Sequence, residues 1–208
     1  LGSWGGGKYI ARLSRTFKRS PIVFYAIAEM LIGIGAFVVP YLFGISKILL
    51  QQTGESDSFT FLILSAVFMT ISILPWCICM GVTFPFMMAF VKEIRNTETQ
   101  SFSFLYLANV IGAMFGILIT VTLLIELYGF QNTLWIAGAF NFILSVTAII
   151  IAAQYHRTLL DSKTHKARNA KLFIQPSQRQ SIPLSRVILF TTGFVSIAME
   201  VVWIRLFT

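Results

Sequence analysis

The chain has 208 residues, of which 56% are hydrophobic and only 12% are charged, and its formal net charge is +8. A soluble domain of this size cannot bury so much apolar surface in one core, so we expect a lipid bilayer to solvate much of it. The basic residues lie between apolar runs and not on a soluble module, which argues against nucleic acid as a partner. The composition predicts an all-α, polytopic transmembrane bundle.

The first 20 residues combine clustered glycines with spaced basic residues. They lack the basic start, apolar middle and small-residue cleavage site of a signal peptide. We expect residues 1–20 to form a cytoplasmic loop that follows a helix missing from this sequence. The chain is therefore interpreted as an excerpt of a longer protein.

Crossing about 30 Å of hydrocarbon takes about 20 helical residues. About five apolar runs reach this length, and we expect each of them to span the membrane. Prolines inside the first two runs predict a tilt or a kink. The five runs cover residues 21–50, 60–91, 102–125, 133–153 and 184–208.

Residues 154–183 are polar and basic, and we expect them to form a cytoplasmic linker. The run from residue 184 then begins a second unit, truncated at the end of the chain. His156 and His165 lie in or beside this linker without a cluster of carboxylates or cysteines, so no metal site is predicted. Cys77 and Cys79 lie inside an apolar run, where we expect them only to pack.

Lys and Arg are distributed unevenly over the gaps between the runs. Fourteen of the 16 lie in alternate gaps, and the opposite gaps contain only Lys47. Short loops rich in these residues stay in the cytoplasm, so we expect the amino end inside and the carboxyl end outside. Arg205 then lies at the outer end of the last run. The predicted location is the cell membrane, with a bacterial inner membrane as the expected type.

Two carboxylates fall inside apolar runs. Glu29 lies eight residues into the first run, and Glu200 lies inside the last. Ionisable groups in a membrane usually face a bundle interior or a wet cavity and mark a path for substrate or protons. A carboxyl that only holds two helices together is an equally open interpretation of Glu29. Arg205 is five residues beyond Glu200, about 140° round a helix, and is poorly placed to neutralise it.

The third run contains small residues at intervals of four, which form a groove where another helix can approach closely. Asn109 and Asn141 are polar groups that need partners in a dry interior. Interhelical hydrogen bonding explains these asparagines more simply than contact with a substrate, although both interpretations stay open. The small residues are Ala108, Gly112, Gly116 and Thr120.

Several stretches, taken in order, resemble the membrane region of bacterial spermidine synthase-like proteins, whose helical bundle is fused to an aminopropyltransferase-type domain. The resemblance rests on LGSWGGGKYIARL (1–13), FYAIAEMLIGIGAF (24–37), LPWCICMGVTFPFMMAF (74–90), LYLANVIGAMFGILI (105–119) and GFVSIAMEVVWIRLF (193–207). In the last stretch, Glu200, Trp203 and Arg205 match a signature that also opens such bundles. The resemblance therefore implies a larger bundle of two repeats, similar to the major facilitator type.

The resemblance implies a membrane domain that anchors a synthase-type domain, and it does not fix what the bundle itself does. The two intramembrane carboxylates motivate the hypothesis that the bundle transports a polyamine or another cationic small molecule past Glu29 and Glu200. Nothing in the 208 residues resembles the soluble catalytic domain, so no catalytic residue and no cofactor is assigned, and the expected partners include the missing remainder of the chain. Two alternatives stay open. One is a secondary transporter of the major facilitator type unrelated to polyamine synthesis, and the other is a purely structural membrane scaffold.

Overall fold

The computed structural model describes residues 2–17, 19–52, 58–95, 99–168 and 181–207. Six α-helices and one π-helical segment lie in these ranges, and no strand occurs within them. The predicted all-α class is therefore confirmed. Four of the described stretches are long and apolar enough to cross a membrane, and one of them, Ser103–Arg157, covers two consecutive helices. This agrees with the expectation of about five spans.

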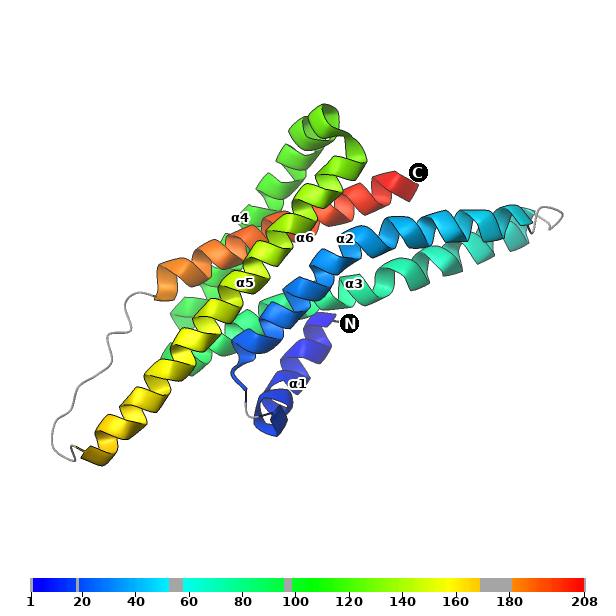
Figure 1. The fold of residues 1–208 in the computed structure, drawn as a ribbon. Helices are drawn as coiled ribbons and strands as arrows, with labels where there is room; N and C mark the ends of the chain where they lie inside the picture. The colour runs from blue at the N-terminus through cyan, green and yellow to red at the C-terminus, as the bar shows by residue number, and fades with distance from the viewer. Residues whose placement is uncertain (1, 18, 53–57, 96–98, 169–180, 208) are drawn as a thin grey trace.

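Helices α2 (Pro21–Gln52) and α3 (Ser58–Arg95) form the first hairpin, drawn in blue and cyan in Figure 1. Both helices continue past their internal prolines at positions 40, 75 and 85. At 1.5 Å per residue, the 38 residues of α3 extend over about 57 Å, well beyond the ~30 Å of a hydrocarbon core. A helix of this length must tilt or project from the bilayer.

Helices α4 (Thr99–Ile119) and α5 (Ile125–Arg168) form the second hairpin, joined through the π-helical segment η1 (Thr120–Leu124). Figure 1 shows this hairpin in green and yellow, with its turn at the top. The structure corrects the predicted linker at both of its ends, because α5 continues through residues 154–168 and the next helix begins at Ser181. Residues 169–180 of the predicted linker lie outside the described residues. Residues 139–168 contain no glycine or proline, and their polar members include many good helix formers, so nothing ends the helix where hydrophobicity falls.

Gly129, at the turn of this hairpin, interrupts the helical backbone with φ 71° and ψ 174°. A Cβ at this position would meet no atom of another described segment within 4 Å, so the expected cost of substitution comes from backbone conformation. Because residues other than glycine rarely adopt such angles, we expect Gly129→Ala to lower the free energy of unfolding by about 1 to 2 kcal/mol. Unfolding curves in detergent would measure this loss of stability, and an unchanged unfolding midpoint would contradict the prediction.

Residues 2–17 form a helix, α1 (Gly2–Phe17), and not the predicted loop. Its glycines allow close packing on α3. A Cβ on Gly2 would collide with the backbone of Ile78, and one on Gly6 would lie 3.1 Å from a methyl carbon of Val82. The clustered glycines therefore mark a contact between helices, which sequence alone does not distinguish from a flexible turn.

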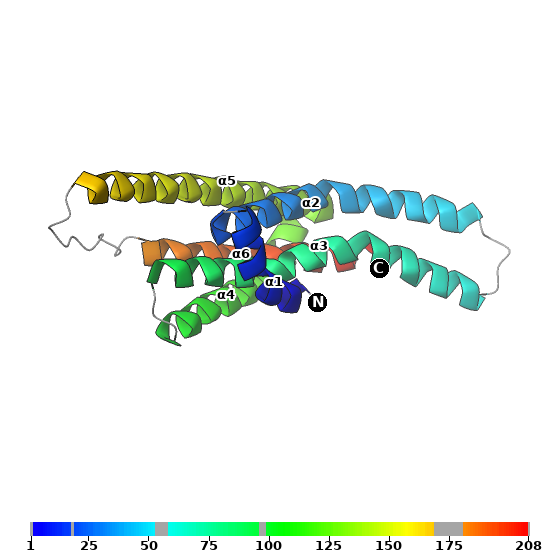
Figure 2. The ribbon, with the colours of Figure 1, turned by 90° about the horizontal axis from the view of Figure 1, so that it is seen from below.

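Helix α6 (Ser181–Phe207) runs through the middle of the molecule and contacts α4, α5, α3 and α2. Figure 2 shows α2 and α5 on one side of α6 and α4 on the other. Two buried apolar clusters follow each other along α6. The first includes Ile22, Tyr25, Leu144 and Leu189, and the second includes Ile32, Leu134, Met199 and Trp203.

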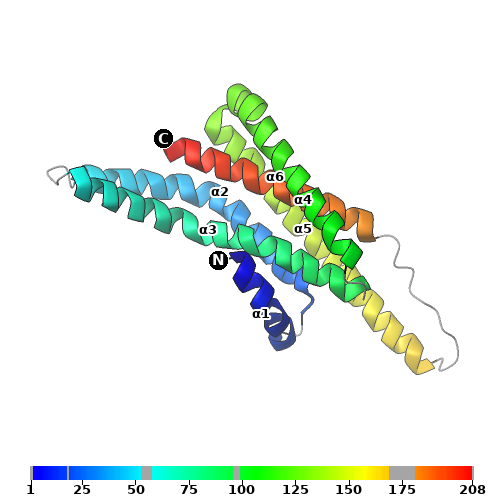
Figure 3. The same cartoon turned by 180° about the vertical axis from the view of Figure 1, so that it is seen from behind.

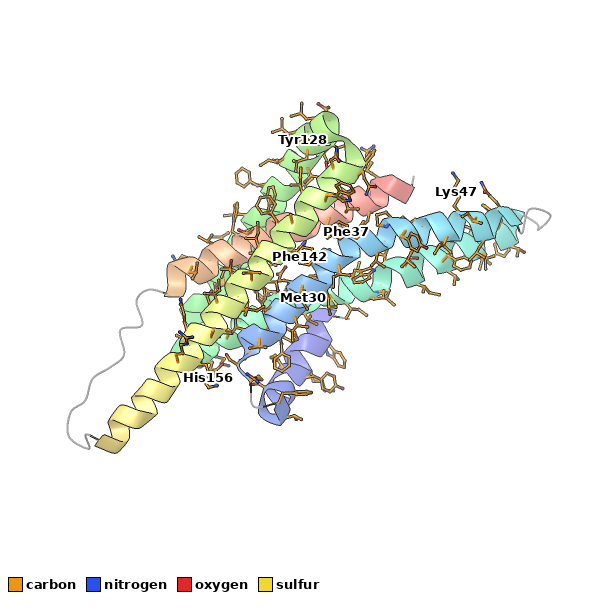
Figure 4. The ribbon with its side chains drawn as sticks, in the orientation of Figure 1. Met30, Phe37, Lys47, Tyr128, Phe142 and His156 are labelled. Carbon is orange, nitrogen blue, oxygen red and sulfur yellow. The ribbon has the colours of Figure 1, made fainter. Side chains whose placement is uncertain are left out.

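The described basic residues between helices gather at one end of the bundle. Ser20 Oγ donates to Glu93 Oε2 at 3.0 Å, next to Lys92. At the same end, Arg186 lies 5.1 Å from the ring of Phe104. Figure 4 shows His156 at this end, and Lys47 and Tyr128 at the opposite end. That the basic end is cytoplasmic stays a prediction.

Candidate functional site

Glu29 is completely buried between α2 and α6. Its Oε1 atom accepts a hydrogen bond from Thr192 Oγ1 at 3.1 Å, across the helix interface. Tyr25 lies one turn earlier on α2, is also fully buried, and its hydroxyl lies 2.5 Å from Thr192 Oγ1. Tyr25, Glu29 and Thr192 therefore form a hydrogen-bonded group that links α2 to α6.

The protons in this group do not satisfy every acceptor. The Thr192 hydroxyl has one hydrogen, and the Ile188 carbonyl oxygen lies 2.9 Å from Thr192 Oγ1 as a competing acceptor. The Tyr25 hydroxyl supplies the only other hydroxyl proton of the group, and its oxygen lies next to the same Thr192 Oγ1. Glu29 Oε2 has no hydrogen-bond partner among the described residues. A buried carboxylate oxygen thus lacks a donor.

Asn141 of α5 also has a buried acceptor oxygen without a hydrogen-bond donor among the described residues. Its side chain is fully buried, and Nδ2 donates to the Ala137 carbonyl oxygen at 3.0 Å and contacts Met199 Sδ at 3.7 Å. Asn141 Oδ1 has no partner within the described part of the chain. A helix-interior amide whose oxygen is left without a donor is costly in a dry environment.

Two contacts place Glu29 and Asn141 at the same height of the antiparallel α2–α5 pair. Ser145 Oγ donates to the Ala26 carbonyl oxygen at 2.8 Å, one turn from each residue on one side. On the other side, a Cβ on Gly33 would lie 3.3 Å from the Gly138 carbonyl oxygen. Phe37 and Phe142 also face each other there, with ring centroids 6.4 Å apart (Figure 4).

A thin polar layer therefore separates the two apolar clusters. Glu29 follows Tyr25 and precedes Ile32 on α2, and Thr192 lies between Leu189 and Met199 on α6. Asn141 lies between Leu134 and Leu144 on α5 in the same way. Three helices thus contribute one polar side chain each, and two oxygens of this layer lack donors. Chemically, this arrangement accepts hydrogen bonds from a group with several N–H donors.

Glu200 lies apart from this layer. It is exposed on α6, and it interacts electrostatically with Cys77 of α3. Cys77 is itself exposed, while Cys79 is half-buried. The two predicted carboxylates therefore have opposite environments, one sealed inside the bundle and one on its surface.

The predicted groove of small residues on α4 faces α6. Gly112 and Gly116 are buried, and a Cβ on either would collide with the backbone of Phe190 or Phe194, respectively. Gly193 provides the complementary small position on α6, because a Cβ there would meet the backbone carbonyl and the side chain of Asn109. Asn109 thus lies in this helix crossing and not in the polar layer.

The remaining predicted positions have packing or terminal locations. Ala108 is half-buried at the start of the groove on α4, and Thr120 is fully buried in η1, with Oγ1 lacking a partner among the described residues. Trp203 packs in the second apolar cluster with 1% of its surface exposed. Arg205 is exposed near the end of α6.

Sequence reasoning did not identify Tyr25, Thr192 or Ser145. Tyr25 precedes Glu29 by four residues, so a tyrosine one helical turn from an intramembrane acid was a usable signal. Thr192 is 163 residues away from Glu29, and no spacing could have paired them. A scan against protein-family models, a search of curated proteins and a search of solved structures found no match to this chain.

Proposed function

We propose that this chain is the membrane domain of a spermidine synthase-like protein, in which Glu29 binds an ammonium group of a cationic small molecule that crosses the bilayer. The class of molecule follows from the charge and the unmet acceptors of the polar layer. The observation that carries the proposal is the fully buried Glu29 carboxylate, whose Oε2 atom has no hydrogen-bond partner among the described residues.

A purely structural carboxylate would be expected to have both oxygens satisfied, because burying an unpaired acceptor costs about 1 to 3 kcal/mol. Glu29 Oε2 and Asn141 Oδ1 both lack donors at one height of the bundle. A protonated primary amine carries three donors and a positive charge, which matches this deficit. Polyamines carry such groups, so the site chemistry and the sequence resemblance favour the same class of substrate.

The remaining parts of the proposal rest on the resemblance and on charge distribution. The bundle anchors an aminopropyltransferase-type domain in a bacterial inner membrane. The end that contains Lys92 and Arg186 faces the cytoplasm, in keeping with the positive-inside rule. The amino end of the chain is then cytoplasmic and its carboxyl end is outside.

Transport by the full-length protein in proteoliposomes tests the proposal. We expect Glu29→Gln to reduce uptake of labelled spermidine at least tenfold, because the amide keeps the size and the oxygen that Thr192 contacts but removes the charge that binds the ammonium group. Glu126→Gln is the matched control, since Glu126 is exposed at the start of α5 and the change is chemically identical. Unchanged uptake by the Glu29 variant would contradict the proposal.

A structural scaffold is the second candidate, and the complete burial of Glu29 favours it. A scaffold predicts that Glu29→Gln changes the unfolding midpoint while the wild-type protein moves no spermidine into vesicles. Transport of other cations but not spermidine by the wild-type protein would instead favour a secondary transporter unrelated to polyamine synthesis. The same vesicles thus separate the three interpretations.

A further inference from the structure

An exposed carboxylate and an exposed thiol lie on the surface where α3 and α6 meet. Glu200 on α6 interacts electrostatically with Cys77 on α3, and both side chains are exposed. The two helices are in contact with each other. In the view from behind, α3 and the carboxyl-terminal half of α6 are not covered by another helix (Figure 3).

Both residues of this pair lie within stretches that are long and apolar enough to cross a membrane. Cys77 lies near the centre of the apolar stretch Phe59–Ile94, about 26 Å from either end at 1.5 Å per residue. On α6, Glu200 is within the apolar stretch Arg186–Arg205. Arg205 ends this stretch five residues, about 7.5 Å, beyond Glu200, so the carboxylate lies inside the apolar span but nearer one end of it than its centre.

A carboxylate at this depth is an unsuitable neighbour for lipid. An ionised carboxylate is costly to place against acyl chains. Intramembrane acids accordingly face other protein or a water-filled cavity. The exposed neighbours on this face are apolar, including Leu74 and Ile204, so they would suit lipid, whereas Glu200 would not. The charge of Glu200 therefore argues against lipid at this position.

We infer that the α3–α6 face around Cys77 and Glu200 lines a water-filled passage in the assembled membrane protein, and that Glu200 concentrates organic cations there. The binding of an ammonium group near Glu200 deepens the proposed function and rests on it. The contact of this face with water does not depend on the proposed function. Along α6, Glu200 is eight residues beyond Thr192, about 12 Å, so the passage site and the buried Glu29 site are separate.

Cys77 is a natural reporter of both properties. A thiolate attacks a methanethiosulfonate to form a mixed disulfide and release a sulfinate, and this reaction requires contact with water. In the full-length protein, with Cys77 as the single cysteine, we expect the reagent bearing trimethylammonium to react at least tenfold faster than the reagent bearing sulfonate. Both rates are normalised to those with free 2-mercaptoethanol, and the protein is in sealed proteoliposomes.

A Glu200 variant and competition by spermidine identify the cause of the difference between the two labelling rates. Glu200→Gln is expected to reduce the rate ratio at least threefold, because it removes the charge and keeps the shape. Spermidine is expected to slow labelling of Cys77 by the cationic reagent in the wild-type background. A protein with Cys79 as the single cysteine is the control, since Cys79 is two residues along α3, about 160° away from Cys77 round the helix, and half-buried.

Three results would overturn the inference. Labelling of Cys77 only after unfolding in sodium dodecyl sulfate would mean that lipid or another helix covers this face. Equal normalised rates for the two reagents would mean that water is present without selection for cations. A ratio that is unchanged in Glu200→Gln would remove Glu200 as the cause. Charge-selective labelling together with normal transport by Glu29→Gln would contradict the proposed role of Glu29 alone.

Discussion

Thr192→Val is expected to destabilise the folded bundle by about 3 kcal/mol, although valine has nearly the shape of threonine. The Thr192 hydroxyl is the contact that Tyr25 and Glu29 share, and all three side chains are buried. Removing it leaves a phenol and a carboxylate without this partner, and each unsatisfied buried group costs about 1 to 3 kcal/mol. The free energy of unfolding in mixed micelles, titrated with sodium dodecyl sulfate, measures the loss.

Thr191→Val is the matched control for this substitution. Thr191 is the preceding residue of α6 and is half-buried, and among the described residues its hydroxyl donates only to the Val187 carbonyl oxygen of its own helix. We expect this variant to stay within about 0.5 kcal/mol of the wild type. Thr192→Ser should retain most of the stability, because the hydroxyl remains. Equal losses of unfolding free energy in Thr191→Val and Thr192→Val would show that the hydrogen-bonded group of Tyr25, Glu29 and Thr192 does not cause the destabilisation.

Gly112→Ala is expected to cost about 2 to 3 kcal/mol through the α4–α6 contact. The added methyl would overlap the backbone of Phe190, which cannot move aside as a flexible side chain can. In a membrane, close packing and not hydrophobic exclusion holds helices together, so a forced separation loses most of the attraction at this crossing. Unfolding midpoints in the same mixed micelles measure the effect.

Gly44→Ala makes the same chemical change where no other described part of the chain outside its own helical turn lies within 4 Å of the new carbon. Gly44 is inside α2, so alanine is expected to stabilise the helix by about 0.5 to 1 kcal/mol. Opposite signs for Gly44→Ala and Gly112→Ala would establish that the α4–α6 crossing requires glycine. A Gly112→Ala protein as stable as wild type would instead show that α6 does not lie on this face of α4.

Two corrections come from residues whose sequence pattern has two meanings. Clustered glycines are typical of turns, yet Gly2 and Gly6 are in a helix, where the missing side chains let α1 approach α3. Residues 154–168 are polar and basic, as loops often are, yet they extend α5. The composition of a segment indicates where the chain leaves the hydrocarbon region. A helix, in contrast, ends at residues whose backbone conformation or capping interactions stop it.

The sequence by itself determined the helical class, the approximate spans and which ends of the helices are basic. These features depend on the length and polarity of contiguous segments, and a bilayer imposes its thickness on each segment separately. The Gly112 and Gly116 spacing likewise marked one face of one helix without any knowledge of its neighbour.

Only the tertiary structure decided which carboxylate is buried and which is exposed. Glu29 and Glu200 look alike in sequence, since each is an acid within an apolar run, but Glu29 faces Thr192 while Glu200 lies on the α3–α6 surface beside Cys77. Which side of a helix meets another helix depends on how the helices pack in three dimensions. That packing joins residues more than 160 positions apart, and no local pattern contains it.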